Sequence, residues 1–445
     1  MQNKLLFKFL KYIQPTSYFN LKITNGNYVF PNPLNLPEEV LCQLKRDESF
    51  SSTKAIEYDL AWQAVQYGYV GNANKIQAIT EVSLADEYRF IRKYFQPIWG
   101  VYCLFLRVLS FNNPIKELRA WSKSKKFTKR TEVFGLNQIE NFNSFESELI
   151  VSKTLVSVII PTLNRYDYLA DVLKDFEKQT YPYFELIIVD QSDDFKETFY
   201  ANFNLNINLI RQEEKALWLA RNTAIKNSKG SIIALSEDDV RIKDDWIEQH
   251  LKCLDYFKAT ISAGVFYPEG SSIPKNRSYF AVAQQFATGN AMLYKDIFSK
   301  VGLFDRQFEK QRMGDGEFGL RCFKAGFKSI SNPFASCVDV KAPTGGLREL
   351  GSWDAFRPTN WFAPRPVPSV LYYYQTYFGK SATRYALLKS IPSSIIPYQY
   401  KRNKKMKLIG MFISVFISPL ILFQIFKSWR LAAVKLKEGN LIDNL

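Results

Sequence analysis

The segment LVSVIIPTLNRYDYLADVLKDFEKQTYPYFELIIVD, residues 155–190, contains two apolar runs on either side of a helix-like stretch. Residues 155–160 and 184–190 have the nearly continuous apolar character of strands that are buried on both faces. Between them, residues 165–179 carry apolar side chains at helical spacing. A strand, a helix and a second strand in this order predict a βαβ unit with parallel strands. The helical positions are Leu169, Val172, Leu173 and Phe176.

The same alternation continues further along the chain. Residues 207–210 and 231–235 are predicted strands, and residues 216–230 between them predict a helix that closes on Gly230. We therefore expect an α/β fold with a mostly parallel central sheet and helices on both faces. Ligands of such sheets bind beyond the carboxyl ends of the strands.

Polar side chains follow three of these predicted strands. Thr162 and Asn164 follow the first strand, Asp190 ends the second, and the acidic triplet 237–239 follows the fourth. Adjacent like charges repel, so an acidic triplet at the end of a buried strand predicts a positively charged partner. A divalent metal ion is the first interpretation, and a solvated acidic turn is the alternative.

Composition limits the classes of function. A chain of 445 residues exceeds one ordinary core, so we expect two or three units. The formal charge of +16 favours anionic lipid or phosphate-bearing substrates, and no zinc-finger spacing or RNP-like motif supports nucleic acid as a partner. Five cysteines without a CxxC pair predict reduced thiols in a cytosolic setting. The only histidine, His250, excludes a histidine-rich metal site, and we expect it at the surface or in packing.

Six motifs in order make residues 155–348 resemble a family 2 glycosyltransferase with the GT-A (Rossmann-like) fold. No one of them is decisive, and their order and spacing carry the resemblance. They are VSVIIPTLNR, LIIVDQSDD, LWLARNTAIKNSKG, LSEDDV, GNAMLYKDIFSKVGLFD and GDGEFGLRCFKAGFK.

The resemblance implies a nucleotide-sugar donor held with Mn²⁺ or Mg²⁺. It assigns the metal to Asp239, with Glu237 standing where Asp is commoner and Asp339 standing where the family often has His. Oxygen donors suit both cations, because the diphosphate of the donor supplies the remaining ligands. The residues that it places at the donor are Pro161, Thr162, Asn164, Arg165, Asp190, Arg221, Asn222, Asp238, Gly289, Asn290 and Arg348.

The catalytic base is expected in GDGEFGLR. Direct displacement at the anomeric carbon needs a carboxylate that accepts the proton of the acceptor hydroxyl. The resemblance assigns this role to Asp315, with Glu317 as the second candidate, and Gly314 stands where an acid is common. The alternative is structural: Asp315 caps a helix, and Glu317 pairs with Arg321 four residues on. Structural alternatives also stay open for Asp190 as a turn residue, for Arg221 as a solvated helix residue and for residues 288–290 as a plain loop.

The flanking regions are predicted to be separate. We expect an N-terminal region of unknown role at 1–150, mixed and rich in helix, a GT-A domain at 151–350 and a helical, basic region at 351–445. Residues 408–426 carry no charge and are flanked by basic residues, which favours a helix or hairpin lying in an anionic leaflet. A membrane span and a soluble core helix are the alternatives. The apolar stretch at 97–111 is too short for a span and predicts a buried or interfacial helix.

These features together predict an inverting, metal-dependent glycosyltransferase of cell-surface polysaccharide synthesis. The expected donor is a nucleoside diphosphate-sugar, UDP-sugar first, and the expected acceptor is a glycan or a polyprenyl-linked sugar. The expected location is the cytoplasmic face of a bacterial inner membrane. A catalytically inactive sugar-nucleotide or glycan-binding scaffold is one alternative. A nucleotidyltransferase is a weaker one, because PTLNRYDY lacks the glycines of its phosphate loop.

Overall fold

The computed structural model contains two compact units. The helical unit comprises Met1–Glu140 and Tyr374–Ser393, and the sheet unit comprises Asn141–Tyr373 and Ser394–Leu445. Residues 351–445, expected as a region of their own, are therefore shared between the units. The described residues are 4–128, 130, 135–136, 139, 141–342, 346, 355–400 and 403–445.

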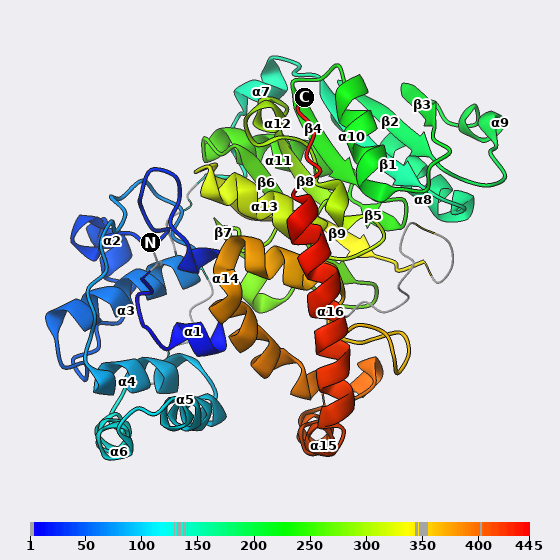
Figure 1. The fold of residues 1–445 in the computed structure, drawn as a ribbon. Helices are drawn as coiled ribbons and strands as arrows, with labels where there is room; N and C mark the ends of the chain where they lie inside the picture. Colours follow the sequence, from blue (N-terminus) through cyan, green and yellow to red (C-terminus); the bar gives the residue numbers. More distant parts are fainter. Residues whose placement is uncertain are drawn as a thin grey trace. The chain divides into compact units, whose positions relative to one another are not determined.

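The sheet unit is built on a nine-stranded sheet in the order β3-β2-β1-β4-β8-β6-β9-β5, with β7 paired to β9 (Figure 1). The first four strands of this order are parallel, and they are the four strands predicted from the sequence. The rest of the sheet is mixed, because β8 runs antiparallel to both β4 and β6. The expected α/β class is confirmed. The strands are β1 (Val156–Thr162), β2 (Phe184–Asp190), β3 (Ile207–Arg211), β4 (Ile232–Ser236), β5 (Val240–Ile242), β6 (Ile261–Pro268), β7 (Ala281–Val282), β8 (Asn290–Tyr294) and β9 (Ser329–Asp339).

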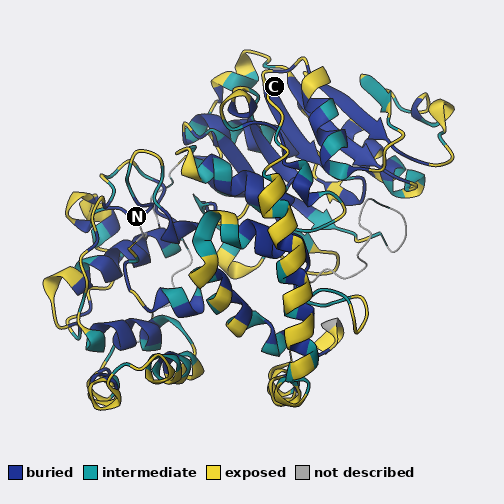
Figure 2. Cartoon of the chain, viewed as in Figure 1, coloured by how far each residue is buried: buried dark blue, intermediate teal, exposed yellow. Residues whose placement is uncertain are grey.

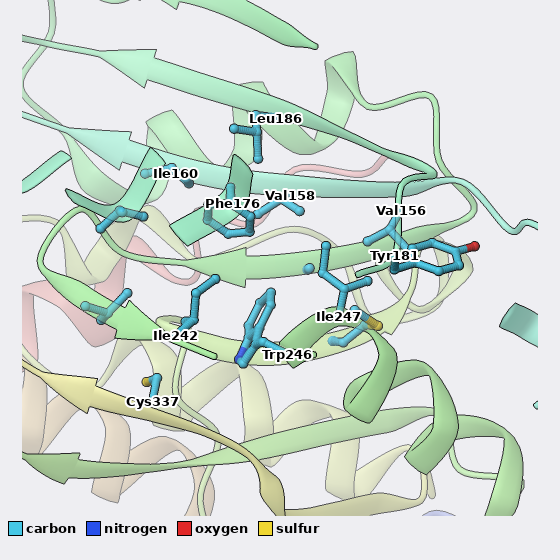
Figure 3. Close-up of a cluster of buried hydrophobic side chains, with 14 of the residues drawn as sticks. Val156, Val158, Ile160, Phe176, Tyr181, Leu186, Ile242, Trp246, Ile247 and Cys337 are labelled. Atoms are coloured by element: carbon cyan, nitrogen blue, oxygen red, sulfur yellow. The ribbon is translucent and has the colours of Figure 1, made fainter. Parts of the chain in front are cut away.

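Helices cover both faces of the sheet, and every residue of β1 is therefore buried. Val158 and Ile160 point to one face, where they pack with α8 (Tyr166–Glu177) and α11 (Trp246–Tyr256) (Figure 3). Successive strand residues face opposite sides, so Ile159 points to the other face, which α10 (Leu217–Asn227) covers. A core on both sides explains why the strand sequences are apolar throughout rather than alternating.

The helical unit has a core rich in aromatic residues around α3 and α4. The rings of Phe7 and Phe90 stack with centroids 3.9 Å apart. Lys93 is buried between two carboxylates, with its Nζ 2.7 Å from Asp59 and 3.0 Å from Asp47. Its helices are α1 (Leu10–Ile13), α2 (Glu38–Leu41), α3 (Thr53–Gln66), α4 (Leu84–Tyr94), α5 (Pro97–Leu109) and α6 (Pro114–Lys123).

The remaining helices precede the first strand, connect the strands or follow the last one. Those of the sheet unit are α7 (Glu148–Val151), α9 (Glu197–Tyr200), α12 (Asp296–Val301), α13 (Gly314–Lys324), α15 (Lys404–Phe416) and α16 (Ser418–Glu438). Helix α14 (Pro368–Ser390) contributes to both units and bends at Gly379.

The uncharged stretch 408–426 is not one helix. It is divided between α15 and α16, which meet at an angle of 86°. Among the described residues no single helix has the length and apolar character of a membrane span, and this bent pair reaches them only in combination. Gly410 is the only buried residue of α15, so α15 is not the core helix that the sequence left as an alternative.

Two expectations about single residue types can be compared with the structure. His250 is fully buried, so its packing role is confirmed, and burial lowers its pKa to about 4. All five cysteines are free, as expected for reduced thiols; Cys42 is exposed and the other four are buried.

Candidate active site

The polar strand ends meet because β1 pairs in parallel with both β2 and β4. Thr162, the last residue of β1, stands opposite Asp190 at the end of β2. On the other side of β1, the chain leaving β4 brings Asp238 within hydrogen-bond distance of Thr162. The Thr162 hydroxyl donates to Asp238 Oδ2 over 2.8 Å, and both side chains are buried.

A cavity of about 40 Å³ lies at this edge of the sheet. It combines the loop after β1, the start of α10 and the acidic triplet after β4. The sequence predicted all of these segments as parts of one site, and it also predicted a loop containing Gly346 there; Leu163 and Leu217 were not singled out. The residues that line the cavity are Pro161, Thr162, Leu163, Arg165, Leu217, Arg221, Glu237, Asp238, Asp239 and Gly346.

Arg165 is the cation nearest to the two buried acids. Its Nη1 lies 3.0 Å from Asp238 Oδ1 and 3.1 Å from Asp239 Oδ2. The backbone at Gly346 passes so close that a Cβ there would stand 2.5 Å from Arg165 Cζ. Because Gly346 also has a φ of +82°, both space and backbone conformation favour glycine at this position. The positively charged partner that was predicted for the acidic triplet is thus an arginine in this structure.

Asp238 is held in an environment that opposes its ionisation. Burial raises its pKa to about 6, and the neighbouring charge of Asp239 acts in the same direction. Arg165 and the hydroxyl of Thr162 act against this shift by stabilising the carboxylate. Asp238 therefore depends on a cation beside it to remain charged.

Arg221 supplies a second positive charge next to the triplet. Its side chain is fully buried, which excludes the solvated role, and its Nη2 lies 3.8 Å from Glu237 Oε1. Glu237 in turn packs against Gly289, where a Cβ would stand 2.7 Å from Glu237 Cδ. Gly289 thus allows the close approach of the β8 entry to the triplet. Asn222, next to Arg221, uses its amide on the backbone of Phe304, with both hydrogen bonds at 2.9 Å.

Five of the described residues that were predicted at the donor do not line the cavity: Asn164, Asp190, Asn222, Gly289 and Asn290. Asp190 is fully buried and accepts hydrogen bonds from the hydroxyls of Tyr166 at 2.6 Å and Tyr200 at 2.8 Å, as a residue that organises a turn. Asn164 has a φ of 55° and donates to Asp193 Oδ2 over 2.8 Å. These contacts shape the loops after β1 and β2.

Asn290 lies in the core of the sheet unit rather than at the cavity. Its Oδ1 accepts from Trp246 Nε1 at 2.9 Å and from His250 Nε2 at 3.0 Å. Its Nδ2 donates to the carbonyl of Ala335 over 3.0 Å. The amide thus joins α11, β8 and β9. The preceding residue, Gly289, is the one that lies against Glu237 of the acidic triplet.

The two candidate bases differ in their surroundings. Glu317 is 1% exposed, and its carboxylate receives Arg321 Nε at 2.7 Å and Nη2 at 3.0 Å, the ion pair that the sequence allowed as the alternative. Asp315 is half-buried at the start of α13, and its Oδ1 accepts from the backbone N–H of Gly316 at 2.8 Å. Of the two, Asp315 is the more accessible carboxylate.

Gly314, which stands where the resemblance led us to expect an acid, has a steric explanation. A Cβ at this position would lie 2.3 Å from Cζ2 of Trp218 on α10. An acidic side chain has no room unless the indole ring moves. The departure from the family pattern therefore reflects packing between α10 and α13.

We expect Gly314→Ala to destabilise the sheet unit by about 1–3 kcal/mol, because the added methyl group overpacks the contact with Trp218. The midpoint of thermal unfolding should fall. Gly100→Ala is the matched control, since a Cβ at Gly100 meets no atom closer than 3.8 Å and alanine favours a helix. Equal melting points for Gly314→Ala and the parent protein would contradict the steric explanation.

The remaining metal-site predictions receive less support from the geometry. Asp339 ends β9 opposite Val240, and its Oδ2 lies 3.8 Å from Lys341 Nζ. Arg348, which was predicted at the donor, lies outside the described residues. Within the described part of the chain, no three His, Cys, Asp or Glu side chains are grouped so that they could hold a metal ion by themselves.

One contributor to the site has no sequence signal. The carboxylate of Glu309 accepts from the backbone N–H groups of Leu219 at 2.8 Å and Trp218 at 3.2 Å, so it caps the start of α10. Burial raises the pKa of Glu309. Some 90 residues separate the partners, and no local pattern could have linked them.

Comparison with known proteins identifies the domain that carries this site. The family model described as "Glycosyl transferase family 2" matches residues 157–315. These residues form a family 2 glycosyltransferase domain. The recognition from six motifs is confirmed, and the matched segment contains the cavity residues from Pro161 to Asp239 as well as Asp315.

The relatives of this family 2 domain match over part of their lengths. Glycosyltransferase GlyA of Streptococcus pneumoniae is 28% identical over 163 residues, which are 36% of this chain and 22% of GlyA. Glycosyltransferase AglE of Haloferax volcanii is 28% identical over 165 residues, 34% of this chain and 52% of AglE. The chain thus spans about half of AglE and about a fifth of GlyA.

Among solved structures, residues 1–349 of TarS from S. aureus, in complex with UDP-GlcNAc, align with a TM-score of 0.43 and 15% identity. The alignment covers 62% of this chain and 81% of that one.

Proposed function

We propose that this protein is an inverting glycosyltransferase that moves a sugar from a nucleoside diphosphate donor to an acceptor hydroxyl. The observation that carries the proposal is the buried acid pair Asp238 and Asp239 beside Arg165, in a cavity at the strand ends of a family 2 domain. A surface turn has no reason to bury two adjacent carboxylates. The family match also sets aside a nucleotidyltransferase.

The carboxylates fit a Mg²⁺ or Mn²⁺ ion. Asp238 and Asp239 both reach the same Nη1 atom of Arg165, so they can approach a single cation. Such ions are often bound by one or two protein carboxylates together with phosphate oxygens of the substrate, which agrees with a site whose described residues include no group of three ligands. A bound cation would offset the charge that develops on the departing diphosphate. Asp239 is the first ligand in this proposal, and Glu237 acts through water.

The residues of the chain have separate tasks in the transfer. Arg221, buried below Glu237, offsets the negative charge that the donor brings to the triplet. Thr162 fixes the carboxylate of Asp238 through its hydroxyl. Asp315 accepts the proton of the attacking acceptor hydroxyl while the bond between the sugar and the diphosphate breaks. Attack from the side opposite the leaving group inverts the anomeric centre.

The acceptor and the location are proposed from charge and apolar surface. The net charge of +16 and the apolar α15 and α16 favour attachment to an anionic leaflet, with a UDP-sugar as donor and a glycan or polyprenyl-linked acceptor. This arrangement fits cell-surface polysaccharide synthesis at the cytoplasmic face of a bacterial inner membrane.

A thermal-shift screen of the full chain tests donor and cation together. UDP-, GDP- and dTDP-sugars are each added with Mn²⁺, with Mg²⁺ or with EDTA. One nucleotide-sugar should raise the melting temperature in the presence of the cation, because a ligand that binds only the folded state stabilises it. A donor that stabilises the protein equally in EDTA would contradict the role of the metal. No stabilisation by any donor would contradict the proposed function.

The variant Arg165→Ala tests binding of the metal ion independently of binding of the donor. Without Arg165, Asp238 and Asp239 are left as buried carboxylates, so the melting temperature in EDTA should fall by an amount equivalent to about 1–3 kcal/mol. Mn²⁺ alone should raise the melting temperature of Arg165→Ala by more than it raises that of the parent protein. Arg241→Ala, which removes the two 2.7 Å hydrogen bonds to Asp175 on α8, is the matched control and should not respond to Mn²⁺.

A further inference from the structure

Helices α5 and α6 of the helical unit turn one ion pair, Arg107 with Glu117, inward. Both helices pack on α4. Glu117 is 2% exposed and accepts hydrogen bonds from Arg107 Nη2 at 2.6 Å and from the hydroxyl of Tyr88 at 2.7 Å. Gly100, Cys103 and Arg107 recur three and four residues apart, so they mark the inner face of α5.

The outward face of the same hairpin is apolar. A water-exposed helix normally presents polar side chains to the solvent, whereas α5 presents large hydrophobic ones at helical spacing. Phe111, between the two helices, is 99% exposed. Contiguous exposed apolar surface marks an interaction site. Figure 2 shows exposed positions along both helices. The exposed apolar residues are Ile98, Val101, Phe105, Val108, Leu109, Phe111, Ile115 and Leu118.

The exposed charges of the hairpin itself have one sign. Between residues 97 and 128 the only acid is Glu117, which is buried against Arg107. Positive charge next to exposed apolar side chains is the composition of a helix that lies in the headgroup region of an anionic membrane. It also disfavours a second copy of the chain, because two identical basic faces repel each other. The exposed basic residues are Lys116, Arg119, Lys123, Lys125 and Lys126.

We propose that the α5–α6 hairpin, residues 97–126, docks on an anionic lipid bilayer. Its apolar side chains enter the boundary between headgroups and acyl chains, and its basic side chains contact the lipid phosphates. The site is distinct from the α15–α16 pair, because it belongs to the other unit of the chain. It does not depend on the proposed glycosyltransferase activity, so either proposal can fail without the other.

A single environment-sensitive label at residue 111 tests the docking directly. Cys42 is the only exposed cysteine, so Cys42→Ser with Phe111→Cys gives one accessible thiol for an NBD probe. The full chain is mixed with vesicles of phosphatidylcholine that contain one quarter phosphatidylglycerol, or with phosphatidylcholine alone. We expect brighter emission at shorter wavelength with the anionic vesicles only. An unchanged melting temperature shows that the labelled protein is folded.

Charge removal provides the second measurement. Replacing Lys116, Arg119 and Lys123 with Gln should raise the vesicle concentration needed for half of the NBD response by about 100-fold, since each base near the surface contributes about 1 kcal/mol. The matched control replaces Lys45, Arg46 and Lys54, three exposed bases elsewhere in the unit, and should leave the response unchanged.

Three results would overturn the proposal. The probe at residue 111 stays in a water-like environment on anionic vesicles, or it responds equally to neutral vesicles. The third result is a probe that is already buried without lipid, together with a dimer in light scattering. It would assign the face to a second copy of the chain.

Discussion

Asp239→Ala is expected to abolish sugar transfer, with a loss of at least about 1000-fold, and to weaken nucleotide-sugar binding in the same protein. Asp239 lines the cavity, shares Arg165 with Asp238 and accepts the backbone N–H of Ala342 at 3.2 Å. Its carboxylate is the proposed first ligand of the cation that meets the diphosphate. Removing it therefore affects ground-state binding and the transition state together.

Asp239→Asn and Asp171→Ala make this result specific. Asn keeps the size and an oxygen acceptor for Ala342 but loses the charge, so it should resemble the alanine variant in activity while melting closer to the parent protein. Asp171 is an exposed acid on α8, 3.5 Å from Lys174, and its loss should leave transfer unchanged. The role of Asp239 would be refuted by a folded Asp239→Asn variant that binds donor and transfers sugar normally.

Asp315→Asn is expected to keep donor affinity and to lose about 100- to 10,000-fold in the rate of transfer, the usual contribution of a general base. Asn has the same shape and still accepts the N–H of Gly316, but it cannot take a proton from the acceptor. Donor affinity is measured by titration calorimetry, and transfer is measured by release of the nucleoside diphosphate. Loss of binding along with transfer would instead assign Asp315 to the donor site.

Glu317→Gln is the informative counterpart. The parent carboxylate is buried and holds Arg321, so the variant weakens a buried ion pair and should lower the melting temperature. Its transfer rate, measured below the melting transition, should stay close to that of the parent. If Glu317→Gln lost transfer while Asp315→Asn kept it, the base would be Glu317.

The parallel half of the fold and the segments that form the site could be predicted from the sequence. Strands buried on both faces require continuous apolar runs, and these periodic signals are local. The order of strands then brought Thr162 and Asp238 to one edge, because adjacent parallel strands end on the same side. The ion pair of Glu317 with Arg321 could also be predicted from the sequence, since residues four apart share a helix face.

The contacts between groups that are far apart in the chain could not be predicted from the sequence. Arg165 reaches Asp238 across 73 residues, Glu309 caps α10 across 90, and Asn290 joins the core through His250 across 40. The size limit at Gly314 is set by Trp218, on another helix. Such contacts depend on how helices pack against both faces of the sheet. Local periodicity carries no information about that packing, so the identity of the cation beside the acids and the boundaries of the two units emerged only from the folded chain.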